Sequence, residues 1–209
     1  MKIAVFGGTG ATGQEIIKQG LERNYHVTVL ARNPAAIQQT SPNLEVIAGN
    51  IADADTVEKV IAGNDAVLSV LGFKRGTSKP TIFADGAKVL MSAMNKTDVK
   101  RLIYCTSAGV EDHDPNEMLI YRYIIKPFFL QEGYNDMKVG EALIRESNLD
   151  WTLVRPSRLT NGPKQEHFRV SPLYRSKGGV AISRADLAYF MLNQITGDEW
   201  VHKTPTLGY

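Results

Sequence analysis

The stretch Gly7-Gly8-Thr9-Gly10-Ala11-Thr12-Gly13 determines how the rest of this chain is interpreted. It follows a short apolar run, Ile3-Ala4-Val5-Phe6, and an amphipathic helical pattern begins directly after it. Three of its glycines have the spacing Gly-x-Gly-x-x-Gly, which on its own is a weak signal. The flanking strand and helix make it specific, because a strand, a tight turn and a helix form the context in which this motif binds phosphates.

Glycine is needed at this turn for three separate reasons. One glycine lets the chain turn sharply, one lets a pyrophosphate approach the backbone, and one lets the helix pack closely on the strand. The free N–H groups at the helix start and the positive end of the helix dipole attract phosphates, and Thr12 is placed to add a hydroxyl donor. We therefore expect a dinucleotide here; the alternative is a glycine-rich turn without a ligand.

The chain has 209 residues, 43% hydrophobic and 22% charged, with a formal net charge of +2. These values are ordinary for one α/β domain, so we expect a single domain over residues 1–209. Scattered lysines and a small net charge argue against nucleic-acid binding. No signal-peptide core or membrane-length apolar run is present, and the single Cys105 excludes an internal disulfide. We expect a cytoplasmic monomer or homodimer that binds neither nucleic acid nor membranes.

The second expected strand, residues 25–31, ends in the sequence Ala31-Arg32-Asn33-Pro34. A site for NAD usually places Asp or Glu here, where it holds the ribose hydroxyls. Arg32 stands in that place, and a guanidinium can pair with the 2'-phosphate of NADP through two charge-assisted hydrogen bonds. We therefore predict NADP (NADPH) as the cofactor, with NAD possible. The alternative is an ordinary exposed arginine at a strand end.

Apolar, β-rich runs alternate with helical patterns along the rest of the chain. Further strands are expected at residues 44–50, 65–72, 101–109 and 151–155, with a short one near 205–207. Helices are expected at residues 53–62, 81–94, 137–146 and 181–195, the third burying Val139, Ala142 and Leu143. This alternation predicts an α/β fold: a doubly wound, parallel Rossmann sheet with helices on both faces, and a short irregular substrate region after strand six.

Ligands bind beside the carboxyl ends of the strands in such a sheet. Asn50 ends the third strand beside the expected adenine pocket, and Leu71-Gly72 ends the fourth below the middle of the cofactor. Ser107, after the fifth strand, is the first catalytic candidate, whereas Cys105 is interpreted as a buried small hydrophobe. The residues expected to contact the cofactor are Gly7, Thr9, Gly10, Ala11, Thr12, Gly13, Arg32, Asn50, Ile51, Leu71, Gly72, Thr106, Ser107 and Pro156.

Four other segments have less specific patterns. Lys74, Arg75 and Lys79 lie in a loop that is either solvated or near an anionic ligand. Residues 111–114, Glu-Asp-His-Asp, form a polar loop rather than a metal site, because no partner ligand has a suitable spacing. Residues 121–130 are expected to cover the substrate, to contact another subunit or to pack in the core. Residues 156–180 are too long for an idle connection, so we expect them to cover the substrate.

By these motifs the sequence resembles the atypical short-chain dehydrogenases/reductases, in the group of biliverdin IX-beta reductase (flavin reductase), NADH-flavin reductase-like and NmrA-like proteins. The stretches that carry the resemblance are residues 7–13, Leu30-Ala31-Arg32, Leu71-Gly72, Cys105-Thr106-Ser107-Ala108, residues 144–156 and residues 182–187. The resemblance implies a Rossmann domain that binds NADP(H) and passes hydride to a flavin-like, quinone-like or tetrapyrrole acceptor. It also implies that Ser107 lies beside the nicotinamide. In the reductase a histidine lies in the loop after strand six, and this sequence has Arg158 at that place. The resemblance therefore implies a cation that could bind an anionic acceptor there, in place of an imidazole that could donate a proton.

Tyr134 and Lys138 have the Tyr-x-x-x-Lys spacing of the Tyr-dependent branch of that superfamily, in which lysine lowers the pKa of the phenol. Counted from Glu141, however, Lys138 is one residue away from its expected position. The catalytic candidates are therefore Ser107, Tyr134, Lys138 and Arg158, without a metal. Two alternatives to the reductase stay open: a non-catalytic NADP sensor of the NmrA type, and a Tyr-dependent epimerase or dehydrogenase of a sugar nucleotide.

Overall fold

The computed structural model describes residues 1–72 and 80–209, so the expectation for Lys74, Arg75 and Lys79 lies outside the described residues. An eight-stranded sheet has the order β3-β2-β1-β4-β5-β6-β10-β8. All neighbouring strands in it are parallel except β10 and β8. Its strands are β1 Lys2–Phe6, β2 His26–Ala31, β3 Leu44–Ala48, β4 Ala66–Ser69, β5 Arg101–Cys105, β6 Asp150–Pro156, β8 Arg169–Ser171 and β10 Thr206–Gly208.

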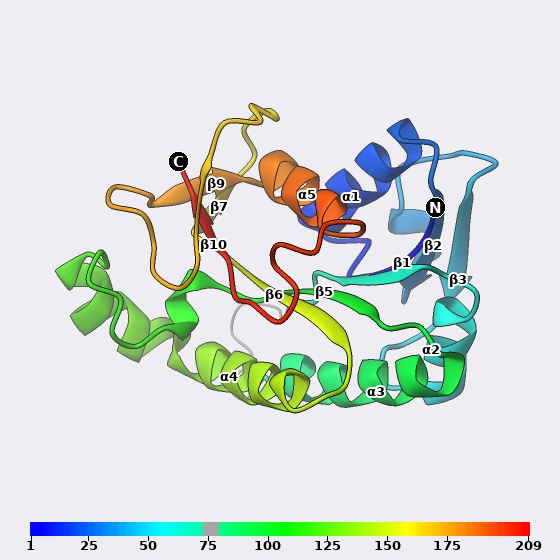
Figure 1. Cartoon of the computed structure of the whole chain (residues 1–209), viewed down its shortest axis with the longest axis horizontal. Coiled ribbons are helices and arrows are strands. Elements are labelled where there is room, and N and C mark those ends of the chain that lie inside the picture. Colours follow the sequence, from blue (N-terminus) through cyan, green and yellow to red (C-terminus); the bar gives the residue numbers. More distant parts are fainter. Residues whose placement is uncertain (73–79) are drawn as a thin grey trace.

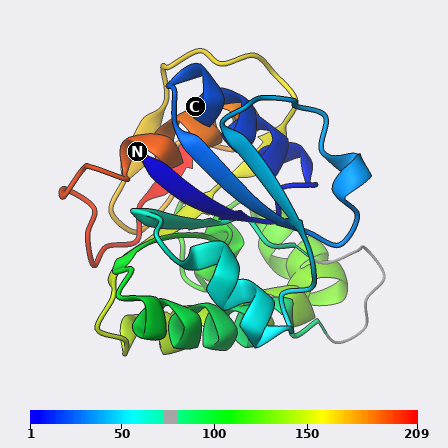
Figure 2. The ribbon, with the colours of Figure 1, turned by 90° about the vertical axis from the view of Figure 1, so that its right-hand side faces the viewer.

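Helices cover both faces of this sheet, as Figures 1 and 2 show. Helices α1 (Ala11–Glu22) and α5 (Arg184–Asn193) lie side by side on one face. Helices α2 (Ala54–Ile61), α3 (Ile82–Thr97) and α4 (Gln131–Arg145) lie on the other. The doubly wound, mostly parallel sheet expected from the sequence is therefore confirmed.

Each strand divides its side chains between two cores, as a sheet covered on both faces requires. In β1, Ala4 and Phe6 join the core beneath α2, α3 and α4, whereas Ile3 and Val5 join the core beneath α1 and α5. The same alternation in β5 buries Cys105 among the second set. Burial raises the pKa of the Cys105 thiol to about 12, so this cysteine is a buried small hydrophobe, as expected.

Helix α4 buries a different face from the one predicted. Val139 and Ala142 are exposed and Leu143 is only half-buried. Asp136 and Glu141 are buried instead, because each carboxylate has partners on a neighbouring element. Asp136 accepts hydrogen bonds from the backbone N–H groups of Phe83 and Ala84, at 3.0 and 2.9 Å, and so caps the first turn of α3. A carboxylate that caps a helix from outside satisfies donors that would otherwise be buried without partners.

The chain after β6 is more regular than expected. Short strands β7 (Arg158–Thr160) and β8 lie within residues 156–180, and β7 pairs in parallel with β9 (Ala181–Ser183). The last helix therefore begins at Arg184 rather than at residue 181. Ser183 is its N-cap, since the Ser183 hydroxyl accepts a hydrogen bond from the Asp186 N–H at 2.9 Å. The short strand expected near residues 205–207 is confirmed as β10.

Among residues 1–72 and 80–209, no helix combines the length and the apolar character that crossing a membrane requires.

Candidate cofactor and substrate site

The glycine turn between β1 and α1 is built as the sequence predicts. Gly7 has φ +89°, a left-handed conformation that side chains rarely adopt, and a Cβ there would lie 2.4 Å from the Val70 carbonyl oxygen. A Cβ at Gly13 would lie 2.3 Å from the Gly7 carbonyl oxygen and 2.6 Å from the Gly8 Cα. The Gly13 position therefore needs glycine because helix α1 packs directly on the backbone of the turn.

Gly10 is different, because the protein itself has room for a side chain at this position. A Cβ at Gly10 would meet only the Gly7 carbonyl oxygen, at 3.3 Å, and the φ of −75° suits any residue. Gly10 is the N-cap of α1, makes no side-chain cap hydrogen bond, and has no acidic residue in the turn after it. Thr9, Gly10 and Ala11 are exposed. The first N–H groups of α1 are therefore open to an anion, which is the arrangement that suits a pyrophosphate.

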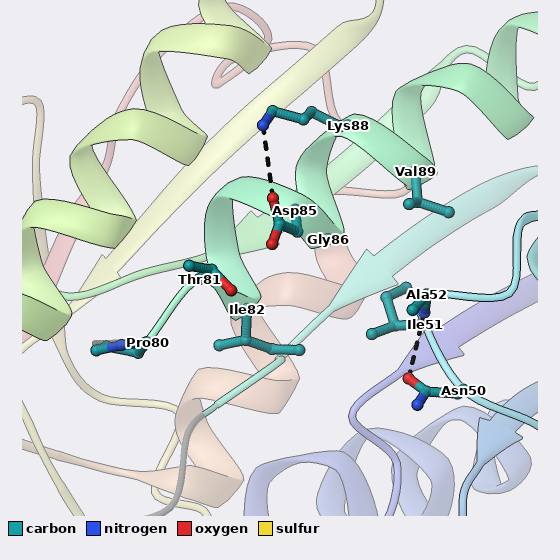
Figure 3. Close-up of a pocket in the computed structure, with 10 residues that line it drawn as sticks. All are labelled: Asn50, Ile51, Ala52, Pro80, Thr81, Ile82, Asp85, Gly86, Lys88 and Val89. Carbon is teal, nitrogen blue, oxygen red and sulfur yellow. Dashed lines mark hydrogen bonds and ion pairs between the residues drawn. The ribbon is translucent and has the colours of Figure 1, made fainter. Parts of the chain in front are cut away.

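A hollow lies between the end of β3 and the start of α3, and Figure 3 shows it from close by. Its volume is about 580 Å³. The lining residues are Asn50, Ile51, Ala52, Pro80, Thr81, Ile82, Asp85, Gly86, Lys88 and Val89. A Cβ at Gly86 would lie 2.7 Å from Leu71 Cδ1 and 3.8 Å from Ile51 Cγ1, so both apolar side chains lie close to Gly86. This apolar wall, edged by the Asn50 side chain, has the chemistry of an adenine pocket.

Arg32 follows directly after β2 and is exposed. In the part of the chain that the structure describes, Arg32 makes no hydrogen bond or ion pair. Asn50 is the polar residue at the same edge of the sheet, and its side-chain oxygen accepts a hydrogen bond from the Ala52 N–H at 3.2 Å. A guanidinium that is not used by the protein is available to a phosphate group.

The opposite end of the site is formed by the residues after β5 and β6. Ser107 is half-buried, and its hydroxyl oxygen accepts a hydrogen bond from the Gly109 N–H at 3.2 Å. Thr106 is buried and donates its hydroxyl to Glu141 at 2.7 Å. Pro156, the last residue of β6, is buried beside Leu207 of β10. A half-buried hydroxyl at the carboxyl edge of a parallel sheet is a suitable position for a group that touches substrate.

Tyr134 and Lys138 lie on the same helix, but the structure gives each another partner. The Lys138 ammonium donates to the Asp112 carboxylate at 2.6 Å, and this contact lowers the pKa of Asp112. The Tyr134 hydroxyl forms a hydrogen bond with the Tyr121 hydroxyl. The ammonium that faces the Tyr134 ring belongs to Lys126, 5.8 Å from the ring centroid. The spacing of a Tyr/Lys dyad is therefore present, but Lys138 pairs with Asp112 and Tyr134 pairs with Tyr121.

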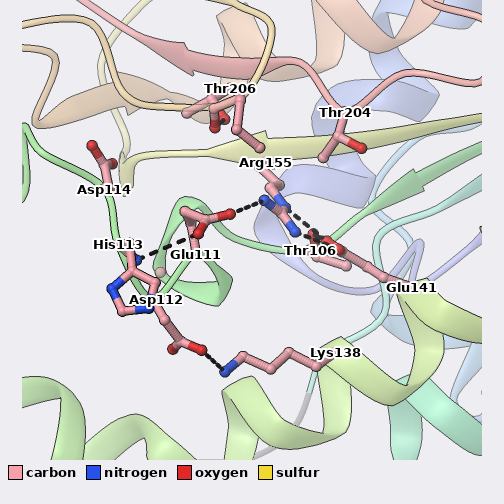
Figure 4. A network of polar contacts seen from close by, with 12 residues as sticks. Thr106, Glu111, Asp112, His113, Asp114, Lys138, Glu141, Arg155, Thr204 and Thr206 are labelled. Carbon is pink, nitrogen blue, oxygen red and sulfur yellow. Dashed lines mark hydrogen bonds and ion pairs between the residues drawn. The ribbon is translucent and has the colours of Figure 1, made fainter.

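A buried ion pair lies directly behind Thr106, and the pattern of the sequence does not predict it (Figure 4). Arg155 on β6 donates to both carboxylate oxygens of Glu141, at 2.9 and 2.6 Å, and to Glu111 at 3.4 Å. Burial alone would lower the pKa of Arg155, but the hydrogen bonds and charge of Glu141, and then of Glu111, raise it. The signal that could have revealed the pair is Arg155 itself, since an arginine at the end of a buried strand needs an acidic partner.

The acidic loop after β5 is less solvated than its composition predicts. Asp114 is only 1% exposed and pairs with Arg175 at 3.0 Å. Asp112 pairs with Lys126 at 3.3 Å as well as with Lys138. The loop therefore ties the segment after β5 to α4 and to residues 156–180. Among residues 1–72 and 80–209, no three His, Cys, Asp or Glu side chains are grouped in a way that could hold a metal ion.

The segment of residues 156–180 is held in place by Asp186. The Asp186 carboxylate accepts hydrogen bonds from the N–H groups of Gln165 and Glu166, at 2.9 and 2.8 Å, and from the Tyr209 hydroxyl at 2.6 Å. Burial would raise the pKa of Asp186, but these hydrogen bonds outweigh burial and lower it. Arg158 is exposed at the beginning of this segment. The segment is therefore ordered, with a cation at its start.

A family model described as NAD(P)H-binding matches residues 7–198. The chain is 24% identical to the Photosystem II assembly factor Ycf39 of Trieres chinensis over 224 residues, which cover 100% of this chain and 64% of that factor. It is 25% identical to the Oxidoreductase stcQ of Emericella nidulans, over 94% of this chain and 77% of that protein. A short-chain dehydrogenase/reductase of Veillonella parvula, solved in complex with NADP, has the same fold, with a TM-score of 0.82, 16% identity, and coverage of 100% of this chain and 94% of that one. This chain spans less than two thirds of the length of the Ycf39 factor.

Proposed function

Because this chain belongs to the NAD(P)H-binding family, we propose that it is an NADPH-dependent reductase. The observation that carries the proposal is the open N-terminus of α1, where Gly10 leaves room that the chain does not use. Membership of this family also confirms the relationship to the atypical short-chain dehydrogenases/reductases inferred from the motifs. The oxidoreductase name of a relative matched over 94% of this chain supports a redox reaction.

We propose that the described residues hold the cofactor along its whole length. The backbone N–H groups of Thr9, Ala11, Thr12 and Gly13 would hold the pyrophosphate next to the turn at Gly7, and the missing side chain at Gly10, whose own N–H donates to the Gly7 carbonyl oxygen, would leave room for it. Arg32 would pair with the 2'-phosphate, and the hollow at Asn50 and Ile51 would hold the adenosine. Leu71 and Gly72 would lie below the middle of the cofactor. Thr106, Ser107 and Pro156 would border the nicotinamide. When bound, the nicotinamide supplies the hydride. The protein positions the acceptor and excludes water from it.

We propose a flavin-like, quinone-like or tetrapyrrole acceptor, placed over Ser107 and under residues 156–180. Such a conjugated acceptor takes its proton from solvent after hydride has moved, so that no activated phenol is required. The partners of Tyr134 and Lys138 support this assignment, because both groups are already engaged within the chain. Arg158, exposed at the start of β7, would attract an acidic acceptor. The test is NADPH oxidation with FMN, a quinone and biliverdin in parallel; turnover with none of them would contradict the proposal.

The Tyr134→Phe variant separates this proposal from a Tyr-dependent epimerase or dehydrogenase. We expect the variant to keep kcat within about twofold of wild type, since solvent supplies the proton; a true Tyr/Lys dyad would lose roughly 100-fold or more. Tyr121→Phe is the matched control, because it breaks the same hydrogen bond and leaves the Tyr134 hydroxyl in place. A large loss of kcat in Tyr134→Phe alone would contradict the proposal and favour the dyad.

The Arg32→Ala variant tests the preference for NADPH. We expect its Kd for NADPH to rise about tenfold, because a charge-assisted pair with the 2'-phosphate is lost at an exposed site, and its Kd for NADH to stay unchanged. Arg23→Ala is a matched control, since Arg23 is a surface arginine that bonds to Asn193 on α5. Calorimetric titration of both variants with NADPH and with NADH measures these Kd values. An equal rise in the Kd for NADPH and for NADH would show that Arg32 does not select the 2'-phosphate.

A second candidate is a non-catalytic NADP sensor that acts through a protein partner. The name of the Ycf39 relative, an assembly factor, supports this class for a protein of similar sequence. The acceptor experiment separates the two candidates. Equal affinity for NADPH and NADP+ with no turnover of any acceptor would favour the sensor.

A further inference from the structure

The segment between the acidic loop and α4 has an exposed apolar side. It consists of Met118, the helical residues 119–120 and the π-helix η3 (Tyr121–Leu130), which leads directly into α4 and projects at the left of Figure 1. Phe128 is 76% exposed, Leu119 69% and Tyr123 66%. With Met118, Ile120 and Ile124 they form what we call the apolar face. Packing in the core, one of the roles expected for residues 121–130, does not describe this side of the segment.

The other side of η3 fixes it to the protein. Residues four or five apart share a side in a π-helix, so Tyr121 and Lys126 lie together. Tyr121 bonds to the Tyr134 hydroxyl, and the buried Lys126 ammonium donates to the Glu111 carbonyl oxygen at 2.7 Å. The inner side thus has its own specific contacts. Turning the apolar face inward would break these contacts and expose a buried ammonium.

The apolar face is large enough to form an interface. Six large apolar side chains that are each more than half exposed offer on the order of 700 Å². The largest apolar patch on a typical monomer is about 300–600 Å², whereas each partner in a standard interface buries about 800 Å². An apolar face of this size matches one half of a stable dimer.

The charges of the segment favour a second copy of the chain as the partner. Residues 118–128 contain two cations, and both are neutralised within the chain: Arg122 lies 3.5 Å from Glu117, and Lys126 lies 3.3 Å from Asp112. Within residues 118–128, therefore, no unpaired cation remains to attract an anionic lipid surface or an acidic protein. Two identical faces of this kind can meet across a two-fold axis without charge repulsion. We propose that this protein forms a homodimer in which the two apolar faces pack against each other.

Sedimentation equilibrium on the full chain tests this proposal. Wild type is expected to be a dimer, and Ile124→Asp and Phe128→Asp are each expected to raise the dimer Kd on the order of 100-fold or more, because each dimer would bury two unpaired carboxylates. Val139→Asp is the matched control, since Val139 is 50% exposed on α4 outside the apolar face, and it should leave the dimer Kd unchanged. Thermal unfolding of every variant shows that the fold is retained.

Two outcomes would overturn the proposal. One is a wild-type protein that stays monomeric at the highest concentration measured; flotation of that monomer with neutral phosphatidylcholine vesicles would show that lipid covers the face. The other is a wild-type dimer that persists in both aspartate variants, which would place the interface elsewhere. The proposal is independent of cofactor binding, because the open turn at Gly10 lies between β1 and α1 and does not include residues 118–128.

Discussion

Gly10→Ala is expected to keep the fold of the protein and to lose most of its affinity for NADPH. The added Cβ would meet only the Gly7 carbonyl oxygen, at 3.3 Å, and Gly10 already has a φ that alanine accepts. Alanine is a poorer N-cap than glycine, so we expect the free energy of unfolding to fall by at most about 1 kcal/mol. The methyl group would stand over the N–H groups that face the pyrophosphate. We expect the Kd for NADPH to rise about 100-fold.

The matched variant is Gly13→Ala, three residues further along the same helix. Its Cβ would lie 2.3 Å from the Gly7 carbonyl oxygen and 2.6 Å from the Gly8 Cα, and backbone atoms cannot move away as a side chain can. We expect Gly13→Ala to destabilise the protein itself by about 3 kcal/mol or more. Thermal unfolding and calorimetric titration of both variants separate the two roles. If Gly10→Ala bound NADPH as tightly as wild type, this turn would not be the phosphate site.

Glu141→Gln is expected to destabilise the protein strongly, although the substitution hardly changes the size of the side chain. It removes the charge that balances the buried Arg155 guanidinium and leaves only Glu111, at 3.4 Å, as its acidic partner. Removing one member of a buried ion pair typically costs about 3–5 kcal/mol, and the Glu111 contact places the expected loss at about 3 kcal/mol. For a chain of this size that corresponds to a fall in Tm of roughly 6–12 °C. Differential scanning calorimetry measures it.

The control for that substitution is Glu58→Gln on α2. Glu58 pairs with Lys96 at 2.9 Å, but both side chains are well exposed, so solvent screens the pair and we expect hardly any change in Tm. A Glu141→Gln protein whose Tm matched that of Glu58→Gln would mean that Arg155 is satisfied without Glu141.

The strands and the glycine turn could be predicted because their local pattern and their final environment agree. Residues 3–6 are apolar throughout and become a strand that is buried on both faces. Gly7 and Gly13 stand where the turn needs a left-handed residue and a close helix contact. The family followed from the same stretch, because its spacing and its flanking elements together are specific. The cytoplasmic location and the single domain stay predictions.

The buried face of α4 could not be predicted from the pattern of apolar residues. Helical periodicity treats charged residues as solvent-facing, and Asp136 and Glu141 depart from that rule because their partners come from other elements. The Tyr-x-x-x-Lys spacing, by contrast, indicates a dyad, but both of its side chains have other partners in the structure. It places two side chains on one side of a helix, but it cannot show that the loop after β5 supplies Asp112 to Lys138 and that η3 supplies Tyr121 to Tyr134.

The strands of residues 156–183 are too short for a pattern to reveal them. Three residues such as Arg158–Thr160 contain less than two periods of alternation, and they become a strand only because β9 lies beside them. The sequence also could not predict which side of residues 118–128 is exposed. A run so rich in aliphatic and aromatic residues is normally buried, and only the contacts of Tyr121 and Lys126 decide which side faces the protein.

Calorimetric titration of the wild-type protein with NADPH and, separately, with NADH tests the central claim most directly. The account predicts saturable binding of one dinucleotide per chain, with NADPH bound about tenfold more tightly than NADH because Arg32 reaches the 2'-phosphate. Absence of saturable binding of either dinucleotide would contradict it.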